Sequence, residues 1–458
     1  MSRAVRAAPV PATPFEAAVG ARIDGLATWR HRLVPPVLLG LVMLFDSWDA
    51  VVTAQVMPAL IHLWKLDPVM TGWLISAGYA GQFLGAFIFG PFAERYGRMP
   101  VLHVALIMMS ALAIACAVTP SYGALMALRC VQGLAIGGAL PLAITYISEL
   151  APAPIRGRYF ALFQFLTMSG YTLASLVGIL VIPNFGWRWM FAIGAAPLLL
   201  LPVVAMVLPE SPRWLARRGR VSDANRALAR LGASEVTGVL AADHVETAVK
   251  HERISPLELF SASHRRDTFI ILPLWLLSSV VVFGVVNWAT TIHTSFYHVS
   301  HATALGFLAT AGICYLILAP LVGSLTDKVG RRTLGILCAC VSVVALGTLT
   351  LFNPMTQPVP AILIHAGSIG LSVMVSMILY TYSAESFPTR VRATALGFFS
   401  SMNRLAAMFV PLLIGGVIKT TGSIQPVFAL FTVCAAAILL IFVFLTRETA
   451  GRSLEEIA

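Results

Sequence analysis

Residues 90–98 read GPFAERYGR, and residues 323–331 read GSLTDKVGR. Both stretches begin with glycine, carry an acidic and then a basic residue in the middle, and end in Gly-Arg. A second pair of stretches repeats in the same way, since ELAPAPIRG begins at Glu149 and ESFPTRVRA begins at Glu385. The two offsets are 233 and 236 residues. Two unrelated motifs that recur at almost one offset indicate that the chain contains an internal duplication.

The segments between these motifs are too apolar for a soluble protein. The chain has 458 residues, of which 58% are hydrophobic and 11% are charged, and its mean hydropathy is +0.85. Soluble domains carry roughly 25% charged residues. None of the six cysteines has the spacing of a zinc or redox site; they are Cys116, Cys130, Cys314, Cys338, Cys340 and Cys434. We therefore expect a membrane protein with no metal and no cofactor.

Twelve windows are long and apolar enough to cross a bilayer, which takes about 20 residues of helix. They lie near residues 34–58, 71–92, 100–119, 122–146, 158–182, 187–208, 268–292, 302–325, 333–352, 358–384, 392–418 and 424–446. The predicted fold class is an all-α membrane protein with twelve transmembrane helices in two six-helix bundles, the architecture of transporters with a site near the midplane. The expected parts are a cytoplasmic N-terminal tail (1–33), an N-terminal bundle (34–208), a cytoplasmic linker loop (209–267), a C-terminal bundle (268–446) and a cytoplasmic C-terminal tail (447–458).

The distribution of lysine and arginine predicts the orientation. Of the 31 basic residues, Lys65, Arg188 and Lys419 fall in loops that join odd to even spans, and Arg129 and Arg404 fall within spans. The remaining 26 lie in the two tails and the other loops. Because cytoplasmic loops carry the excess of lysine and arginine, we expect both termini on the cytoplasmic side of a bacterial inner (plasma) membrane. The net charge of +11 is then a topology signal, and we expect no nucleic-acid partner.

The motifs resemble those of a known transporter superfamily. The repeated pattern G-x-x-x-[DE]-[RK]-x-G-R resembles the loop signature of the major facilitator superfamily, and RCVQGLAIGG from Arg129 is similar to its fourth-span motif. PESPRWLARRGR from Pro209 and ETAGRSLEEI from Glu448 resemble the sugar-porter-like branch. FDSWD, residues 45–49, resembles the D-G-x-D motif of aromatic acid:proton symporters and nicotinate carriers, with Ser47 where that motif has glycine. The resemblance covers essentially the whole chain and implies a twelve-helix secondary transporter.

The loop motifs place acid–base pairs at tight turns on the predicted cytoplasmic side. Such pairs can latch the two bundles together and release them when the bundles rock. The residues of this predicted cytoplasmic gate are Glu94, Arg95, Arg98, Glu149, Arg156, Asp327, Arg331, Arg332, Glu385 and Arg392. We expect Glu149 to interact with Arg156, and Glu385 with Arg392. The alternative is a solvated basic loop that only sets topology, but the pattern recurs in both halves, which favours the latch.

Charged residues inside a span are functional-site hypotheses by default, and this chain has four of them, Asp46, Asp49, Arg129 and Arg404. At about 1.5 Å per residue, Asp49 lies about 22 Å and Arg129 about 20 Å above the cytoplasmic ends of their spans, so the two can meet. Two carboxylates three residues apart share a helix face and do not readily both ionise. We predict that Asp49 and Arg129 form the proton-coupling pair, while Asp46 tunes that pair or touches substrate. A static Asp49–Arg129 bridge is the alternative. The resemblance implies the same pair, because proton-coupled sugar porters place a first-span aspartate opposite the fourth-span arginine.

Arg404 has no acidic neighbour within its own span. A guanidinium near the midplane suits an anionic substrate, because it binds a carboxylate through two parallel hydrogen bonds. The alternative is that Arg404 pairs with Asp46 across the bundle interface. The other candidate substrate contacts are Asp46, Trp48, Gln164, Tyr171, Asn287, Trp288 and Asn403, each of which has packing as its alternative role. His103 and His365 are candidate proton relays, although a packing role is the more common one for such residues.

These observations favour proton-coupled uptake of a small aromatic monocarboxylate, such as a benzoate-like acid or nicotinate. The alternatives are a sugar or polyol symporter, an organic-cation carrier that uses Asp46 as the counter-ion, and a non-transporting receptor on the same fold. No catalytic constellation is present, so an enzyme is not expected, and the linker loop has no nucleotide-binding motif that would indicate ATP-driven transport. The expected partners are the substrate, protons and the lipid bilayer, and the expected state is a monomer.

Overall fold

The structure, a computed structural model, describes residues 14–26, 29–236, 255–352 and 358–449. Within these ranges every regular element is helical. Twelve segments are long and apolar enough to cross a membrane, and each coincides with one of the predicted spans. The predicted fold class is therefore confirmed. Of the predicted tails and linker loop, residues 1–13, 27–28, 237–254 and 450–458 lie outside the described residues, as does the side chain of Asp327.

Most spans are single long helices. These are α2 (Trp29–Trp64), α3 (Pro68–Tyr96), α4 (Arg98–Val118), α5 (Tyr122–Leu150), α6 (Arg156–Phe185), α12 (His301–Val329), α13 (Arg331–Leu351), α16 (Thr389–Thr421) and α17 (Gln425–Phe444). Three spans are interrupted or end irregularly. The sixth consists of α7 (Arg188–Ile193) and α8 (Pro197–Val207), the seventh of α11 (Arg265–Thr291) and the π turn η3 (Ile292–Phe296), and the tenth of α14 (Val359–Val373), the π turn η4 (Met374–Leu379) and α15 (Tyr380–Glu385).

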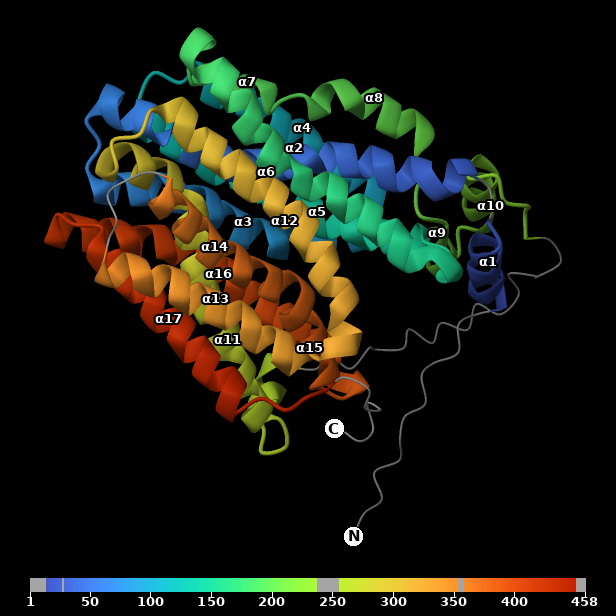
Figure 1. The fold of residues 1–458 in the computed structure, drawn as a ribbon. Coiled ribbons are helices and arrows are strands. Elements are labelled where there is room, and N and C mark those ends of the chain that lie inside the picture. The colour runs from blue at the N-terminus through green and yellow to red at the C-terminus, as the bar shows by residue number, and fades with distance from the viewer. Residues whose placement is uncertain (1–13, 27–28, 237–254, 353–357, 450–458) are drawn as a thin grey trace.

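The spans pack as two groups (Figure 1), which we call the N half (α2–α8, blue to green) and the C half (α11–α17, yellow to red). Each half has its own apolar core. Leu102, Tyr146 and Phe163 are fully buried in the N half, and Trp275 and Phe431 are fully buried in the C half. A core inside each half allows the two halves to move as units.

The halves meet through three helix pairs, α3 with α16, α6 with α12 and α2 with α11. Several cross-half contacts lie at the end of the molecule where α2 ends and α3 begins. There Lys419 Nζ lies 2.9 Å from Asp67 Oδ2, and His301 Nε2 lies 2.7 Å from the carbonyl oxygen of Gln55. A Cβ on Gly415 would overlap the carbonyl oxygen of Pro68. We call this the far end, and the opposite end, which carries the repeated loop motifs, the motif end.

The helix pair α3–α5 is the most closely packed contact within the N half. Gly81 and Gly85 on α3 face Gly133 and Gly137 on α5, and both pairs have the small-x-x-x-small spacing that lets membrane helices approach closely. A Cβ on Gly81 would overlap the carbonyl oxygen of Cys130, and one on Gly137 would overlap that of Gln82. This close approach brings α5, which carries Arg129, against its neighbours.

Short helices cover the motif end of the N half. They are α1 (Pro14–Asp24), the 3₁₀ turn η1 (Ala153–Ile155), α9 (Pro212–Arg217), α10 (Val221–Arg230) and, on the C half, the 3₁₀ turn η2 (Pro256–Phe260). Phe15 and Val19 of α1 pack with Trp214 and Leu228 in a small buried apolar cluster. Trp214 Nε1 donates to the carbonyl oxygen of Glu94 at 3.1 Å. Residues 209–236 of the linker are therefore folded onto the N half.

The Asp67–Lys419 ion pair gives a test of the closed far end. Asp67 also caps α3, because its Oδ1 accepts from the Met70 N–H at 2.8 Å, and this bond and Lys419 together lower the pKa of Asp67. Because the pKa is lowered, the stabilisation that the ionised Asp67 contributes is present above about pH 4. It is lost only as the pH falls through the lowered pKa. Asp67→Asn keeps a capping side chain but loses the ion pair. Since exposed pairs contribute about 0.2–1 kcal/mol, we expect at most about a fivefold shift toward an open far end.

Spin-label distances across the far end measure this shift. Lys419→Gln should reproduce it, and Lys65→Gln, which removes a neighbouring exposed charge outside the pair, should not. Equal shifts in Lys65→Gln and Lys419→Gln would contradict the assigned contact.

Candidate functional site

A buried network joins α2 and α5 near the middle of the N half. Arg129 Nη1 lies 2.6 Å from Asp49 Oδ2, and both side chains are at most 5% exposed. Arg129 Nη2 also donates to the carbonyl oxygen of Asp49 at 3.0 Å. Gln132 accepts from Arg129 Nη1 at 2.8 Å and donates to Asp49 Oδ1 at 3.0 Å. Both carboxylate oxygens of Asp49 therefore accept a hydrogen bond, the arrangement of an ionised carboxylate.

The surroundings of Arg129 fix its position. The guanidinium lies over the ring of Phe191, 5.8 Å from its centroid, and Gly78 leaves the space that it occupies, since a Cβ there would lie 3.5 Å from Arg129 Nη2. Gln132 was not among the residues predicted from sequence. Its spacing of three from Arg129 places it on the same helix face and could have identified it.

Asp46 is placed quite differently from Asp49. It is 7% exposed, and its Oδ1 makes no hydrogen bond within the part of the chain that the structure describes. The charges of Asp49 and Arg404 are the ones that act on it. The first-span carboxylates are thus one paired anion and one buried acid that lies within electrostatic range of Asp49 and Arg404.

Arg404 reaches from α16 into the N half. Its Nη1 donates to the carbonyl oxygen of Gly137 on α5 at 3.2 Å. The buried residues Asp46, Asp49 and Arg129 and the half-buried Arg404 therefore form a set with two negative and two positive formal charges. Arg404 does not line the central cavity, although the preceding residue, Asn403, does.

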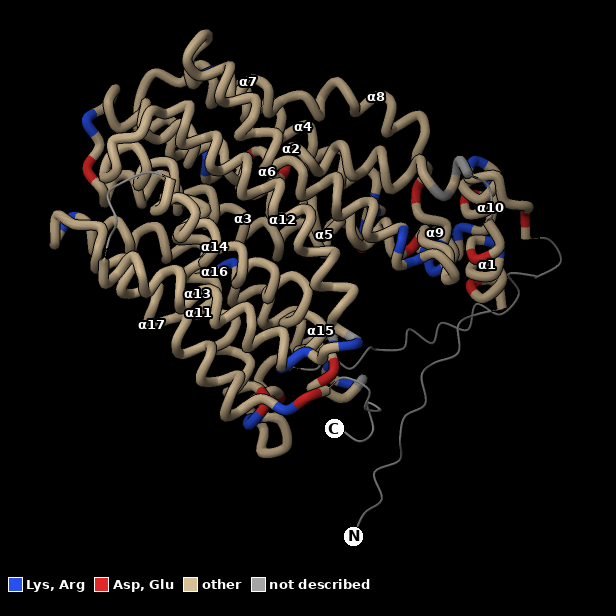
Figure 2. The backbone as a smooth tube through the Cα atoms, in the orientation of Figure 1, with Lys and Arg blue, Asp and Glu red and all other residues tan. Residues whose placement is uncertain are grey.

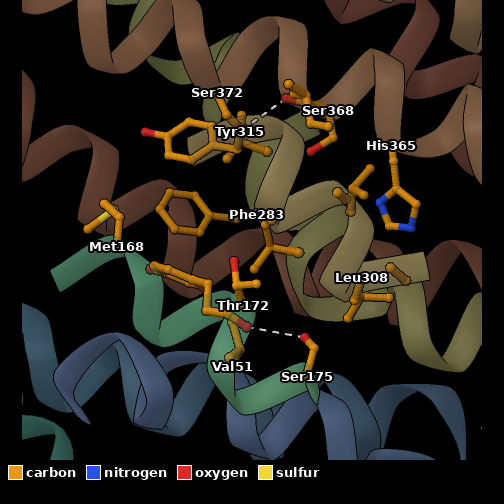
Figure 3. A pocket seen from close by; sticks show the side chains of 18 of the residues that line it. Val51, Met168, Thr172, Ser175, Phe283, Leu308, Tyr315, His365, Ser368 and Ser372 are labelled. Carbon is orange, nitrogen blue, oxygen red and sulfur yellow. Dashed lines mark hydrogen bonds between the residues drawn. The ribbon is translucent and has the colours of Figure 1, made fainter. Parts of the chain in front are cut away.

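A central cavity of about 320 Å³ lies between the halves. Figure 3 shows its walls, which come from α2 and α6 of the N half and from α11, α12, α14, η4 and α16 of the C half. Tyr171, Phe283 and Tyr315 supply aromatic surface, surrounded by aliphatic side chains. The lining residues within the described chain include no arginine, lysine, aspartate or glutamate. A cavity of this size and polarity fits a small, largely apolar ligand.

The polar groups of the cavity mostly bond to one another or to their own helices. Gln55 Nε2 donates to Ser175 Oγ at 2.8 Å, and Ser279 Oγ donates to Asn403 Oδ1 at 2.5 Å. The hydroxyl of Ser372 donates to the carbonyl oxygen four residues earlier at 2.9 Å, as does that of Ser376. Ser368, Ser372 and Ser376 recur every four residues along the tenth span, a spacing from which this lining face could have been predicted.

Two of the predicted substrate contacts, Tyr171 and Asn403, line this cavity. The other predicted contacts lie outside its walls in the described chain. Trp48 donates to the carbonyl oxygen of Met190 at 3.0 Å, Asn287 is 3.3 Å from the hydroxyl of Tyr79, and Trp288 is buried in the C-half core. The remaining ones outside the walls are Gln164, Asp46 and Arg404. Their roles toward a substrate stay predictions.

At the motif end of the N half, the predicted gate residues form a network that includes the linker. Arg98 Nη2 lies 2.8 Å from Glu94 and 3.2 Å from Glu149, and Arg217 lies 2.5 Å from the same Glu149 oxygen. The preceding Gly97 has φ of 108°, a backbone conformation that favours glycine. Glu210 accepts from the N–H groups of Arg98 and Met99 at 3.1 and 3.2 Å, at the start of α4.

The C half repeats this arrangement. Arg331 Nη2 lies 2.9 Å from Glu385, and Gly330 has φ of 98°. Glu448 accepts from the N–H groups of Arg331 and Arg332 at 2.8 and 3.1 Å, as Glu210 does in the N half. The hydroxyl of Thr449 donates to Glu385 at 2.6 Å. The motifs PESPRW and ETAGR thus supply equivalent carboxylates, one to each half.

The expected partners of Glu149 and Glu385 differ from those that the structure gives them. Arg98 and Arg217 bind Glu149, while Arg156 is exposed. Arg331 binds Glu385, while Arg392 donates to the carbonyl oxygen of Phe387 at 3.3 Å. Arg98 and Arg331 reach the two glutamates from the starts of α4 and α13, and Arg217 reaches Glu149 from the linker, which folds onto the helix ends.

The other predicted gate residues make local contacts. Arg95 lies over the ring of Tyr96, and Arg332 donates to the carbonyl oxygens of Phe442 and Val443. Figure 2 shows the charged residues of the motif end in two separate groups, one around α9 and α10 and one around α15. The gate contacts described above therefore run within each half, and a latch between the halves stays a prediction.

The family of this chain follows from comparison with known sequences. A sequence profile described as "Sugar (and other) transporter" matches residues 49–458. The chain belongs to this transporter family. The niacin transporter of Acinetobacter baylyi is 30% identical to this transporter over 448 residues, which cover 95% of this chain and 98% of that protein. The arabinose-proton symporter of Bacillus subtilis is 29% identical and covers 91% of this chain and 92% of its own.

Two further similarities bear on the substrate class and the fold. The 4-hydroxybenzoate transporter of Acinetobacter baylyi is 28% identical over 83% of this transporter and 83% of its own length. The inward open conformation of the xylose transporter from E. coli matches with a TM-score of 0.72 at 20% identity, over 93% of this chain and 99% of that chain. This transporter is therefore a multi-pass membrane protein of the same fold, and its family is one of transporters and not of enzymes.

Proposed function

We propose that this transporter couples proton entry to the uptake of a small aromatic monocarboxylate across a bacterial inner membrane. In this proposal the motif end and both termini face the cytoplasm, as the excess of lysine and arginine indicates. The main support for this proposal is that the uncharged central cavity lies beside the buried Asp49–Arg129 network. One helix belongs to both, because α2 contributes Asp49 to the network and Val51 and Gln55 to the cavity wall.

Asp49 would carry the coupling proton. Protonation removes the charge that balances Arg129, and it turns one of the two oxygens that now accept from Arg129 and Gln132 into a hydroxyl, which is a donor and a weaker acceptor. Arg129 must then rely on Gln132 and the carbonyl oxygen of Asp49. The contact between α2 and α5 therefore differs in energy between the two protonation states, which is the requirement for a proton to shift a conformational equilibrium.

The cavity favours an aromatic acid over a sugar. Each of its two amides, Gln55 and Asn403, already makes one hydrogen bond to a serine hydroxyl, and its walls carry Tyr171, Phe283 and aliphatic side chains that suit a planar ring. A sugar presents several hydroxyls, and each one left without a partner costs about 1–3 kcal/mol. The similar niacin and 4-hydroxybenzoate transporters support the same choice.

A sugar is the second candidate substrate, because the cavity carries several hydroxyls and because a sugar symporter is among the similar proteins. Five serine hydroxyls line the walls, those of Ser175, Ser279, Ser368, Ser372 and Ser376. The arabinose-proton symporter is nearly as similar to this transporter as the niacin transporter is. A pentose would have to displace the bonds that the hydroxyls of Ser175, Ser279, Ser372 and Ser376 now make.

Uptake into proteoliposomes tests the proposal. Labelled nicotinate, benzoate, xylose and arabinose are each supplied with and without an inward-directed proton gradient. We expect accumulation of at least one of the two acids, dependent on the gradient, and none of the sugars. Gradient-driven uptake of a sugar alone would overturn the substrate class, and binding of the acids without any uptake would indicate a receptor.

Arg404 has two possible partners, and its position favours one of them. Because it lies outside the cavity wall and within range of Asp46, we propose that it balances Asp46. Removing Arg404 would leave the buried Asp46 without the charge that balances it, which is costly in a low-dielectric site, so Arg404→Ala should lower the melting temperature of the purified protein by several degrees. Adding Asp46→Asn should restore most of that loss. The affinity for benzoate should change less than about threefold.

The role of Arg404 as a direct carboxylate ligand predicts the opposite pattern. In that case Arg404→Ala would lower benzoate affinity by at least tenfold, Arg404→Lys would restore part of it, and Asp46→Asn would rescue neither property. Thermal melts and benzoate titrations on the wild type and these three variants separate the two roles.

A further inference from the structure

Two histidines beside the central cavity, one buried and one half-buried, have no part in the mechanism described above. His293 is fully buried in the π turn η3 of the seventh span, and His365 lies on α14 in the cavity wall (Figure 3). Their Nε2 atoms are 3.3 Å apart, and their ring centroids are 5.4 Å apart. The two residues are 72 positions apart in the chain, and π turns of this kind occur often at functional sites.

The contact between the two rings determines how they can hold protons. In a hydrogen bond between two Nε2 atoms, one nitrogen must carry the hydrogen and the other must offer a lone pair. The Nδ1 atom of His293 is buried and makes no hydrogen bond within the described residues. One added proton gives a cation in which both Nδ1 atoms carry hydrogen, and repulsion between like charges opposes a second one. The two rings therefore form a site for a single proton.

The surroundings of the two histidines contain no charged partner that the structure describes. The walls of the central cavity and of a second cavity between α12, α13 and α14, which His365 also lines, include no acidic or basic side chain other than this histidine. The ring of Phe307 lies 5.4 Å from that of His293. The titratable side chains that face the two histidines from neighbouring elements are Tyr297, Cys314, Tyr315 and Cys338. Burial disfavours the charged form of an isolated histidine, so the empty site is expected to be neutral.

An anionic substrate changes this balance. A carboxylate in an uncharged cavity would be left without a counter-charge, which is costly in a low-dielectric site. Among the described lining residues, His365 is the one that can become a cation near neutral pH. Its Nδ1–H would then donate a charge-assisted hydrogen bond to the carboxylate.

We propose that the His293–His365 pair takes up one proton with each carboxylate substrate, and that His365 is the residue that meets the carboxylate. This inference rests on the proposed function, because a neutral sugar would need no such counter-charge. The proton enters the pair as the carboxylate binds, and it returns to water when the carboxylate leaves. The neutral amide of the same ring should bind without taking up a proton.

Calorimetry of benzoate binding tests the proposal on the full-length protein. Titrations in two buffers with different heats of ionisation give the number of protons taken up on binding. The Asp49→Asn chain is the background, so that the coupling carboxylate cannot contribute. We expect uptake of about one proton per benzoate in this chain. Adding His365→Gln should reduce the uptake to near zero and weaken benzoate binding by at least about tenfold.

Two further variants make the result specific. His293→Gln should also lower the proton uptake, because it removes the ring that shares the proton. His62→Gln replaces an exposed histidine of α2 that lines neither cavity, and it should leave uptake and affinity unchanged. Benzoate that still binds with one proton taken up in both His365→Gln and His293→Gln would overturn the proposal.

The proposal can be tested even if both variants fail to fold. In the Asp49→Asn chain, benzoate affinity should fall about tenfold per pH unit above neutrality, since one proton is linked to binding. An affinity that does not change with pH, measured where benzoate is fully ionised, would overturn the proposal. This outcome can be distinguished from a failure of the proposed function, because in that case the wild-type protein would bind neither benzoate nor nicotinate.

Discussion

Replacing Asp49 with asparagine is expected to abolish pH-driven accumulation of substrate and to leave exchange of labelled for unlabelled substrate intact. The introduced amide would still accept a hydrogen bond from Arg129, which now lies 2.6 Å from the carboxylate, but it cannot take up or release a proton. The halves can then rock with substrate bound, whereas the proton gradient has no group to act on. In proteoliposomes the accumulation ratio should fall to about one, the limit for a carrier without coupling.

Asparagine is a sharper test than alanine at this position. Alanine would leave Arg129 buried without a partner at a cost of about 3–5 kcal/mol, so loss of activity could reflect misfolding. Asp46→Asn serves as the matched control, because it removes the neighbouring carboxylate, which makes no hydrogen bond through Oδ1 in the described chain. Accumulation that persists in Asp49→Asn would remove this residue from the coupling mechanism.

Replacing Gly81 with valine is expected to prevent formation of the native N half. A Cβ on Gly81 would overlap the carbonyl oxygen of Cys130 and lie 2.9 Å from the Cα of Gly133. Both are backbone atoms, so no side chain can move aside, and α3 and α5 would have to separate along their contact. Overpacking usually costs about 1–3 kcal/mol and occasionally more, and separation of the helices would also displace Arg129 from Asp49. We expect little folded protein on size-exclusion chromatography.

Gly90 provides the matched control on the same helix. A Cβ there would meet nothing within 4 Å, so Gly90→Val adds the same side chain without a clash. It should change the melting temperature by no more than a few degrees, as expected from helix propensity alone. Equal losses in Gly81→Val and Gly90→Val would show that the α3–α5 contact is not responsible.

Much of the architecture could be predicted because it depends on length and on repetition. A bilayer of fixed thickness requires about 20 apolar residues per helix, and the twelve windows that satisfy this rule became the twelve spans. The pairing of Asp49 with Arg129 could be predicted from their depths in the membrane, because the rise per residue of a helix is nearly constant. Depth places two charges at one level but does not say that they face each other.

What the sequence determined by itself was therefore the set of spans, their duplication, the level of the buried charges and the glycine turns at the motif end. The tertiary structure decided which side chains meet. It placed Arg217 instead of Arg156 on Glu149, left Asp46 without the partner that Asp49 has, and joined His293 to His365. Membrane helices are apolar on nearly all sides, so their sequences say little about how each is rotated about its axis or tilted against its neighbours. Rotation and tilt come from the close packing of whole helices, and they alone brought these residues together.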